Sequence, residues 1–164
     1  MPPDHSRADR SRDADGRALN DRPRDGLGRP LPPGAAGVPR QPEGIRRTPA
    51  ETLYVAQTLL DDRKPFHAHD VFEDQWKQTT GPERDLWRAL AQLAVGITHA
   101  ARGNIRGAVA VLERAATNLG PYAARPPHQI AVPQLCDWAR ASAAGLDAES
   151  TTPCWLDVPR MCAS

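Results

Sequence analysis

The sequence of 164 residues has few cysteines, few aromatic residues and no long apolar run. Its three cysteines, Cys136, Cys154 and Cys162, form no Cys-x-x-Cys pair, which argues against a zinc knuckle or a disulfide scaffold and favours reduced thiols. No stretch approaches the roughly 18 apolar residues that a membrane span requires. The first thirty residues lack the apolar core of a signal peptide. We therefore expect a soluble, cytoplasmic protein.

Motifs for nucleophilic catalysis and for phosphate binding are also missing. The sequence has no glycine-rich phosphate loop and no Gly-x-Ser-x-Gly elbow. The net charge is only +1, and the arginines near the N-terminus have no aromatic residues between them. Neither a nucleic acid nor a membrane surface is therefore the predicted partner. These absences favour a protein without catalytic activity and predict no cofactor.

Residues 1–47 differ in composition from the rest of the chain. They hold eight of the 17 prolines and have ten basic and seven acidic residues, a net charge of +3. Their few apolar residues cannot offset the entropy lost on ordering the segment. We therefore predict a disordered arm at 1–47, one helical domain at 48–146 and an irregular tail at 147–164.

The arm contains the pattern Arg-Asp-x-x-Gly-Arg-x-Leu twice, at 12–19 and at 24–31. One interpretation is a short peptide motif that docks on the domain or on a partner, with Leu19 and Leu31 as anchors. The other is chance repetition in a segment rich in alanine and arginine, and composition alone favours this second interpretation.

From Thr48 onward, apolar residues recur with the period of an α-helix, and this pattern predicts five helices. Their expected ranges are about 49–62, 65–78, 82–102, 105–119 and 132–144. Capping boxes are expected before the first helix, from Thr48 to Glu51, and before the third, from Thr80 to Glu83.

The third predicted helix is apolar on nearly all sides, which is typical of a central helix. Only Gly103 and Asn104, a C-terminal glycine and an N-cap, separate it from the fourth helix. So short a joint makes the two helices antiparallel. The predicted fold is therefore an all-α bundle of about five helices around an antiparallel central hairpin.

Residues 65–119 resemble a family described only as domain of unknown function 309. The resemblance rests on FHAHDVFEDQW (66–76), ERDLWRALAQLAVGITHAARGN (83–104), RGA (106–108) and L-x-R (112–114). The family pattern in the second helix is His-Glu-x-x-Glu-x-x-Trp. His69, Glu73 and Trp76 match it, whereas Asp70 replaces the first glutamate and weakens the case for a catalytic carboxylate at that position. The resemblance implies an all-α bundle and brings no established activity.

Two predicted helices carry polar residues on faces that packing should bury. On a helical wheel, His69 and Glu73 share one third of the second helix with three aromatic residues, whereas His67, Asp70 and Asp74 point toward solvent. A buried carboxylate needs a partner, because its desolvation is costly.

The third helix has a matching polar seam opposite its leucines. If the two faces packed together, they would form a buried polar cluster whose predicted members are His69, Glu73, Gln92 and His99, with Arg88 at its rim.

Three interpretations of this cluster remain open. The first is a satisfied hydrogen-bond network that fixes the register of the helices. The second is a small-molecule or divalent metal site, in a protein such as a hydrolase, with His69, Glu73 and His99 as ligands. The third is an interaction module, since the hairpin formed by the third and fourth helices resembles a single tetratricopeptide unit. Together these observations favour a non-catalytic interaction or scaffold module with an unknown protein or peptide partner, and the metal site is the alternative.

Overall fold

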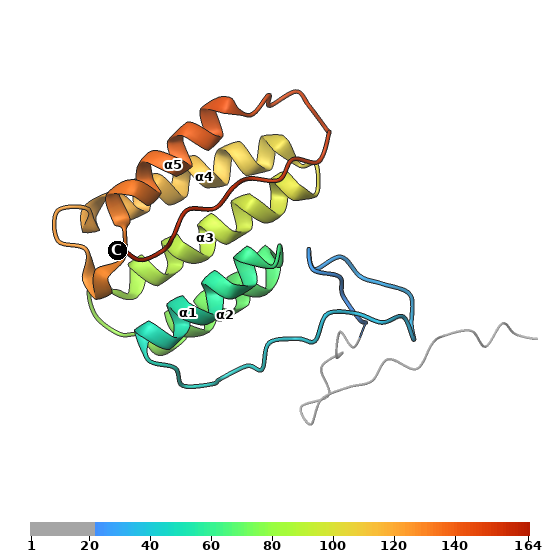
Figure 1. Ribbon diagram of the computed structural model, residues 1–164, viewed down its shortest axis with the longest axis horizontal. Coiled ribbons are helices and arrows are strands. Elements are labelled where there is room, and N and C mark those ends of the chain that lie inside the picture. Colours follow the sequence, from blue (N-terminus) through green and yellow to red (C-terminus); the bar gives the residue numbers. More distant parts are fainter. Residues whose placement is uncertain (1–21) are drawn as a thin grey trace, which may run out of the picture.

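The computed structural model describes residues 22–164, and within this range the chain forms five α-helices and no strand (Figure 1). They are α1 (Pro49–Asp61), α2 (Pro65–Gln78), α3 (Arg84–Ala101), α4 (Ile105–Leu119) and α5 (Val132–Gly145). The predicted all-α bundle is confirmed. None of these helices combines the length and the hydropathy that crossing a membrane requires.

Helix α3 lies in the middle of the bundle, between α1 and α2 on one side and α4 and α5 on the other (Figure 1). Leu86, Trp87 and Leu90 of α3 are fully buried. At Gly96 an added Cβ would come within 2.7 Å of the Leu112 side chain, so the missing side chain lets α3 and α4 approach closely.

Local signals set the ends of the helices. At the start of α1, Thr48 Oγ1 accepts from the N–H of Glu51 at 3.2 Å, and Glu51 Oε2 accepts from the N–H of Thr48 at 2.7 Å. This is the predicted capping box. Between α3 and α4, Gly103 has φ of +82°, and Asn104 Oδ1 accepts from the N–H of Gly107. The two helices of this central hairpin run antiparallel, as predicted (Figure 1).

The C-terminal segment from residue 146 contains no helix and crosses the bundle on its way back toward α1 (Figure 1). The N–H of Cys154 donates to the carbonyl of Ala100 at 2.9 Å, and the N–H of Met161 donates to Gln57 Oε1 at 2.8 Å. Met161 is buried. The segment is therefore part of the packed structure, although it has no regular secondary structure.

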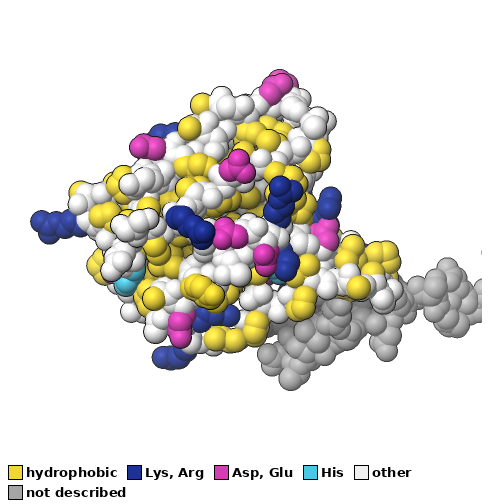
Figure 2. All heavy atoms as spheres, viewed as in Figure 1, with side chains coloured by type: hydrophobic (Ala, Val, Ile, Leu, Met, Phe, Trp, Pro, Cys, Tyr) yellow, Lys and Arg dark blue, Asp and Glu magenta, His cyan; other side chains and the backbone are white. Residues whose placement is uncertain are grey.

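The face of the molecule seen in Figure 2 mixes basic, acidic and apolar side chains, and no large area of one charge forms on it. Residues 22–47 contain no helix. They lie against α2 and α3 through the contacts described below. The rest of the predicted disordered arm, residues 1–21, lies outside the described residues.

Candidate functional site

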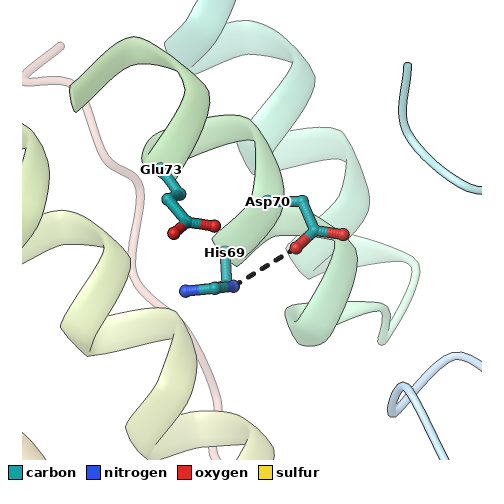
Figure 3. Close-up of side chains that lie close together, drawn as sticks. All are labelled: His69, Asp70 and Glu73. Carbon is teal, nitrogen blue, oxygen red and sulfur yellow. Dashed lines mark ion pairs between the residues drawn. The ribbon is translucent and has the colours of Figure 1, made fainter. Parts of the chain in front are cut away.

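Helix α2 brings three potential metal ligands close together (Figure 3). His69, Asp70 and Glu73 each offer one ligand atom, and these atoms lie within 4.8 Å of one another. His69 Nδ1 lies 3.4 Å from Asp70 Oδ1, and Glu73 Oε1 lies 3.4 Å from Lys77 Nζ. All three side chains are half-buried. The prediction that His69 and Glu73 lie in the core is therefore wrong.

The other members of the predicted cluster lie apart from this group. Gln92 Oε1 accepts from Asn118 Nδ2 at 2.8 Å, and His99 Nδ1 lies 3.1 Å from Asn104 Nδ2. Arg88 is exposed. The polar seam of α3 bonds to α4 and its N-cap instead of to α2. His99 therefore lies apart from His69 and Glu73, and Asp70 lies beside them instead.

His99 has a perturbed pKa in this position. Burial, and then the positive charge of Arg102, lower its pKa below the ordinary value of 6.5. The Asn104 amide donates to Nδ1, which requires an unprotonated Nδ1 and fits the same neutral state.

His67 is the buried histidine of α2, with 1% of its surface exposed, although the sequence predicts it in solvent. The reason is a contact from the N-terminal segment. Its Nε2 lies 3.2 Å from the carbonyl oxygen of Asp25, and because a carbonyl can only accept, Nε2 carries the proton. Its Nδ1 has no hydrogen-bond partner among residues 22–164.

Residues 24–31, the second copy of the repeated pattern, fold into a compact loop that we call the docked loop. Asp25 Oδ1 accepts from the N–H groups of Leu27 and Arg29, both at 2.9 Å, and Oδ2 accepts from Arg29 Nε at 2.7 Å. Arg24 Nη1 donates to the carbonyl of Gly28 at 2.6 Å. Residues that are shared by the two copies of the pattern, Arg24, Asp25, Gly28 and Arg29, therefore close the loop on itself.

These hydrogen bonds also affect the charge of Asp25. Partial burial raises its pKa, but the hydrogen bonds from Arg29 and Leu27 outweigh this effect and hold the pKa below its usual value. The carboxylate is therefore charged at neutral pH and keeps all three hydrogen bonds.

The surface that receives the docked loop consists of Phe66 and His67 of α2 and Arg102 at the end of α3, and we call it the cradle. Leu27 is 6% exposed, and its carbonyl accepts from Arg102 through Nε, at 2.9 Å, and Nη2. Gly28 lies next to the ring of Phe66, with no space for a Cβ atom.

Two arginines flank the same ring, since the guanidinium carbons of Arg24 and Arg102 lie 5.7 and 5.8 Å from its centroid. The predicted anchor Leu31 is only half-buried, and Leu27 takes this role. The other predicted anchor, Leu19, lies outside the described residues.

The segment after the docked loop runs along α2 toward the start of α1. The N–H of Gly44 donates to Asp74 Oδ1 at 3.0 Å, and the carbonyl of Ile45 accepts from Gln78 Nε2 at 2.8 Å. Between these contacts and the cradle lies a cavity of about 460 Å³. Asp70 and Glu73 are among the residues that line it.

A family model with the description "Domain of unknown function (DUF309)" matches residues 53–111. The matched segment begins inside α1 and ends inside α4, so it includes the ligand group on α2 and all three cradle residues but not the docked loop. The resemblance seen in the sequence is confirmed over this segment. No curated protein and no solved structure matches the chain.

Proposed function

We propose, from the geometry, that the chain is a non-catalytic interaction module whose cradle binds a short peptide segment. The family model that matches residues 53–111 describes a domain of unknown function and assigns no activity. The observation that supports this proposal most directly is the docked loop, a short irregular segment held by the bundle through one buried side chain and two backbone carbonyls.

The contacts define what the cradle recognises. His67 and Arg102 bond to the carbonyls of Asp25 and Leu27, so they hold the backbone of a ligand irrespective of its side chains. Selectivity comes from the buried Leu27 and from Gly28, since any larger residue at position 28 would overlap the Phe66 ring. Burial of one leucine contributes about 1.5–3 kcal/mol, enough to distinguish this loop from a sequence without it.

The loop behaves as a ligand that is tethered to its own receptor. Residues 32–47 join it to α1 without any helix, and the N–H of Val38 in this connection donates to the carbonyl of Arg24 at 2.8 Å. A tether of this kind gives the loop an effective concentration on the order of millimolar. A second peptide therefore binds the cradle only when the tethered loop is displaced.

The test uses the full-length chain and a fluorescently labelled peptide of residues 22–31. In the variant Leu27→Asp, the loop should leave the cradle, because a carboxylate would be buried in place of a leucine. We expect anisotropy measurements to show that this variant binds the peptide roughly tenfold or more tightly than the wild-type chain does.

The matched control is Leu31→Asp, which makes the same change at a half-buried leucine of the same loop. This variant should bind the labelled peptide as weakly as the wild-type chain. If the Leu27→Asp variant retains its helical circular dichroism and still fails to bind the peptide, the cradle is not a peptide site.

A further inference from the structure

We propose that His69, Asp70 and Glu73 bind a divalent transition-metal cation whose open coordination positions face the cavity between α2 and residues 40–46. This proposal does not rest on the peptide-binding function proposed for the cradle.

The donor set has suitable chemistry and spacing. One imidazole nitrogen and two carboxylate oxygens suit zinc, manganese or ferrous iron. His69 and Glu73 are one helical turn apart and project on the same side of α2, where Figure 3 shows them beside Asp70. Two atoms bound to one zinc ion at about 2.1 Å can be at most about 4.2 Å apart. The three ligand atoms already lie within 4.8 Å of one another, so small side-chain rotations bring all three within bonding distance of one ion.

The surroundings orient the imidazole. The ring of Phe66 lies against that of His69, with 6.3 Å between the centroids and an interplanar angle of 38°. Phe66 is itself covered by Gly28 and flanked by Arg24 and Arg102. The site is therefore ordered on one side before any ion binds, which reduces the entropy lost on binding.

The only opposite charge within ion-pair distance of Glu73 is Lys77, among residues 22–164. The Lys77 side chain is 60% exposed and the Glu73 side chain is 36% exposed, so water screens the pair. An exposed pair of this kind contributes at most about 1 kcal/mol, so a cation can displace the lysine. Lys77 is thus a competitor for the carboxylate and not a barrier to metal binding.

The cavity supplies the remaining ligands. Asp70 and Glu73 lie on its wall together with Arg40 and Arg46 from the N-terminal segment. A cation bound to the two carboxylates would keep open positions toward this space, where water or an oxyanion can occupy them. The two arginines favour an oxyanion such as phosphate, because guanidinium groups bind phosphate oxygens in pairs.

The experiment is calorimetric titration of the full chain with zinc, repeated with manganese. We expect one ion per chain, and a loss of affinity of at least about tenfold in both His69→Gln and Glu73→Gln, since each removes one of three ligands. Lys77→Met should bind the ion more tightly than the wild-type chain, because the competitor is gone. These positions are half-buried or exposed, so the variants should keep the helical circular dichroism of the wild-type chain.

The matched control is His128→Gln, which removes a histidine that also lies beside a carboxylate, 2.6 Å from Glu83 Oε2. This variant should bind the ion as the wild-type chain does. Binding that survives in both α2 variants, or the absence of stoichiometric binding by the wild-type chain to either ion, overturns the proposal.

The cavity is tested separately with manganese and inorganic phosphate. Phosphate should tighten manganese binding to the wild-type chain, and the double variant Arg40→Gln/Arg46→Gln should lose this gain while it keeps the affinity for manganese alone. If phosphate leaves the affinity of the wild-type chain unchanged, the cavity holds no anion and the ion is bound by α2 alone.

Discussion

Gly28 shows how one residue couples the docked loop to the bundle. Its φ of +71° lies in the left-handed region, and a Cβ atom added to it would overlap the Phe66 ring, so two separate requirements exclude a side chain. Gly34 has a similar φ of +82° but has open space where its Cβ would be. A comparison of substitutions at Gly28 and Gly34 therefore distinguishes the effect of backbone strain from the effect of steric overlap.

Gly28→Ala should release the docked loop, whereas Gly34→Ala should cost only the backbone strain of about 1 kcal/mol. Limited trypsin digestion measures the difference, because cleavage after Arg24 requires the loop to leave the cradle. We expect fast cleavage at this bond in Gly28→Ala and nearly wild-type cleavage in Gly34→Ala. Equal rates in the two variants would show that the ring contact does not hold the loop.

The lowered pKa of His99 predicts that the stability of the fold depends on pH. Burial lowers its pKa in the folded state, so below its ordinary pKa of 6.5 the unfolded chain takes up a proton that the folded chain does not. This group therefore stabilises the fold above about pH 6.5, and its contribution is lost as the pH falls through that value toward the lowered folded pKa.

The variant His99→Gln should weaken this dependence. Urea unfolding at pH 7.5 and pH 5.5 should show a smaller loss of stability on acidification in the variant than in the wild-type chain. An unchanged difference between the two pH values would mean that other groups carry the effect.

At the scale of the helices, the sequence predicts most of what the structure contains. The starts of the helices depend on contacts within four residues, such as the Thr48–Glu51 capping box. Such contacts can be predicted from residues that are close together in the sequence. The exception is the start of α3. Glu83 is expected to complete a capping box with Thr80, but its carboxylate bonds to His128, 45 residues away, and α3 begins at Arg84.

The buried face of α2 could not be predicted either, because it also depends on a residue that is distant in the sequence. A helical wheel places His67 in solvent because it assumes that only other helices cover α2. The carbonyl of Asp25, 42 residues earlier in the chain, lies against this histidine instead. The wheel correctly groups His69 with Glu73, but it places Asp70 away from them, and the structure shows Asp70 beside both.

The central position of α3 gives a direct test of the architecture. Leu90 is fully buried between the helices on either side, so Leu90→Ala should reduce the free energy of unfolding by about 2–5 kcal/mol. Ile45→Ala, at a side chain that is 38% exposed, should change it by less than about 0.5 kcal/mol. Chemical denaturation measures both, and a small loss in Leu90→Ala would place α3 at the edge of the bundle.

At the scale of the whole molecule, the irregular segments before α1 and after α5 pack onto the helical bundle within residues 22–164. Residues 22–47 cover α2, and the segment after α5 covers α3 and returns to α1. The sequence predicts neither arrangement, because these segments lack the periodicity that reveals which side of a helix faces the core. Their docking depends on single buried residues, Leu27 and Met161.

The return of the C-terminal segment to α1 has a consequence for the order of folding. Gln57 and Met161, which share a hydrogen bond, are 104 positions apart. The joints between consecutive helices span three to five residues from α1 to α4 and twelve residues from α4 to α5. Contacts between distant residues form late, because closing a long loop costs entropy before any contact can compensate. The five helices can therefore associate rapidly while the last residues are still free, and the chain reaches its final stability in a slower step when Met161 enters the core.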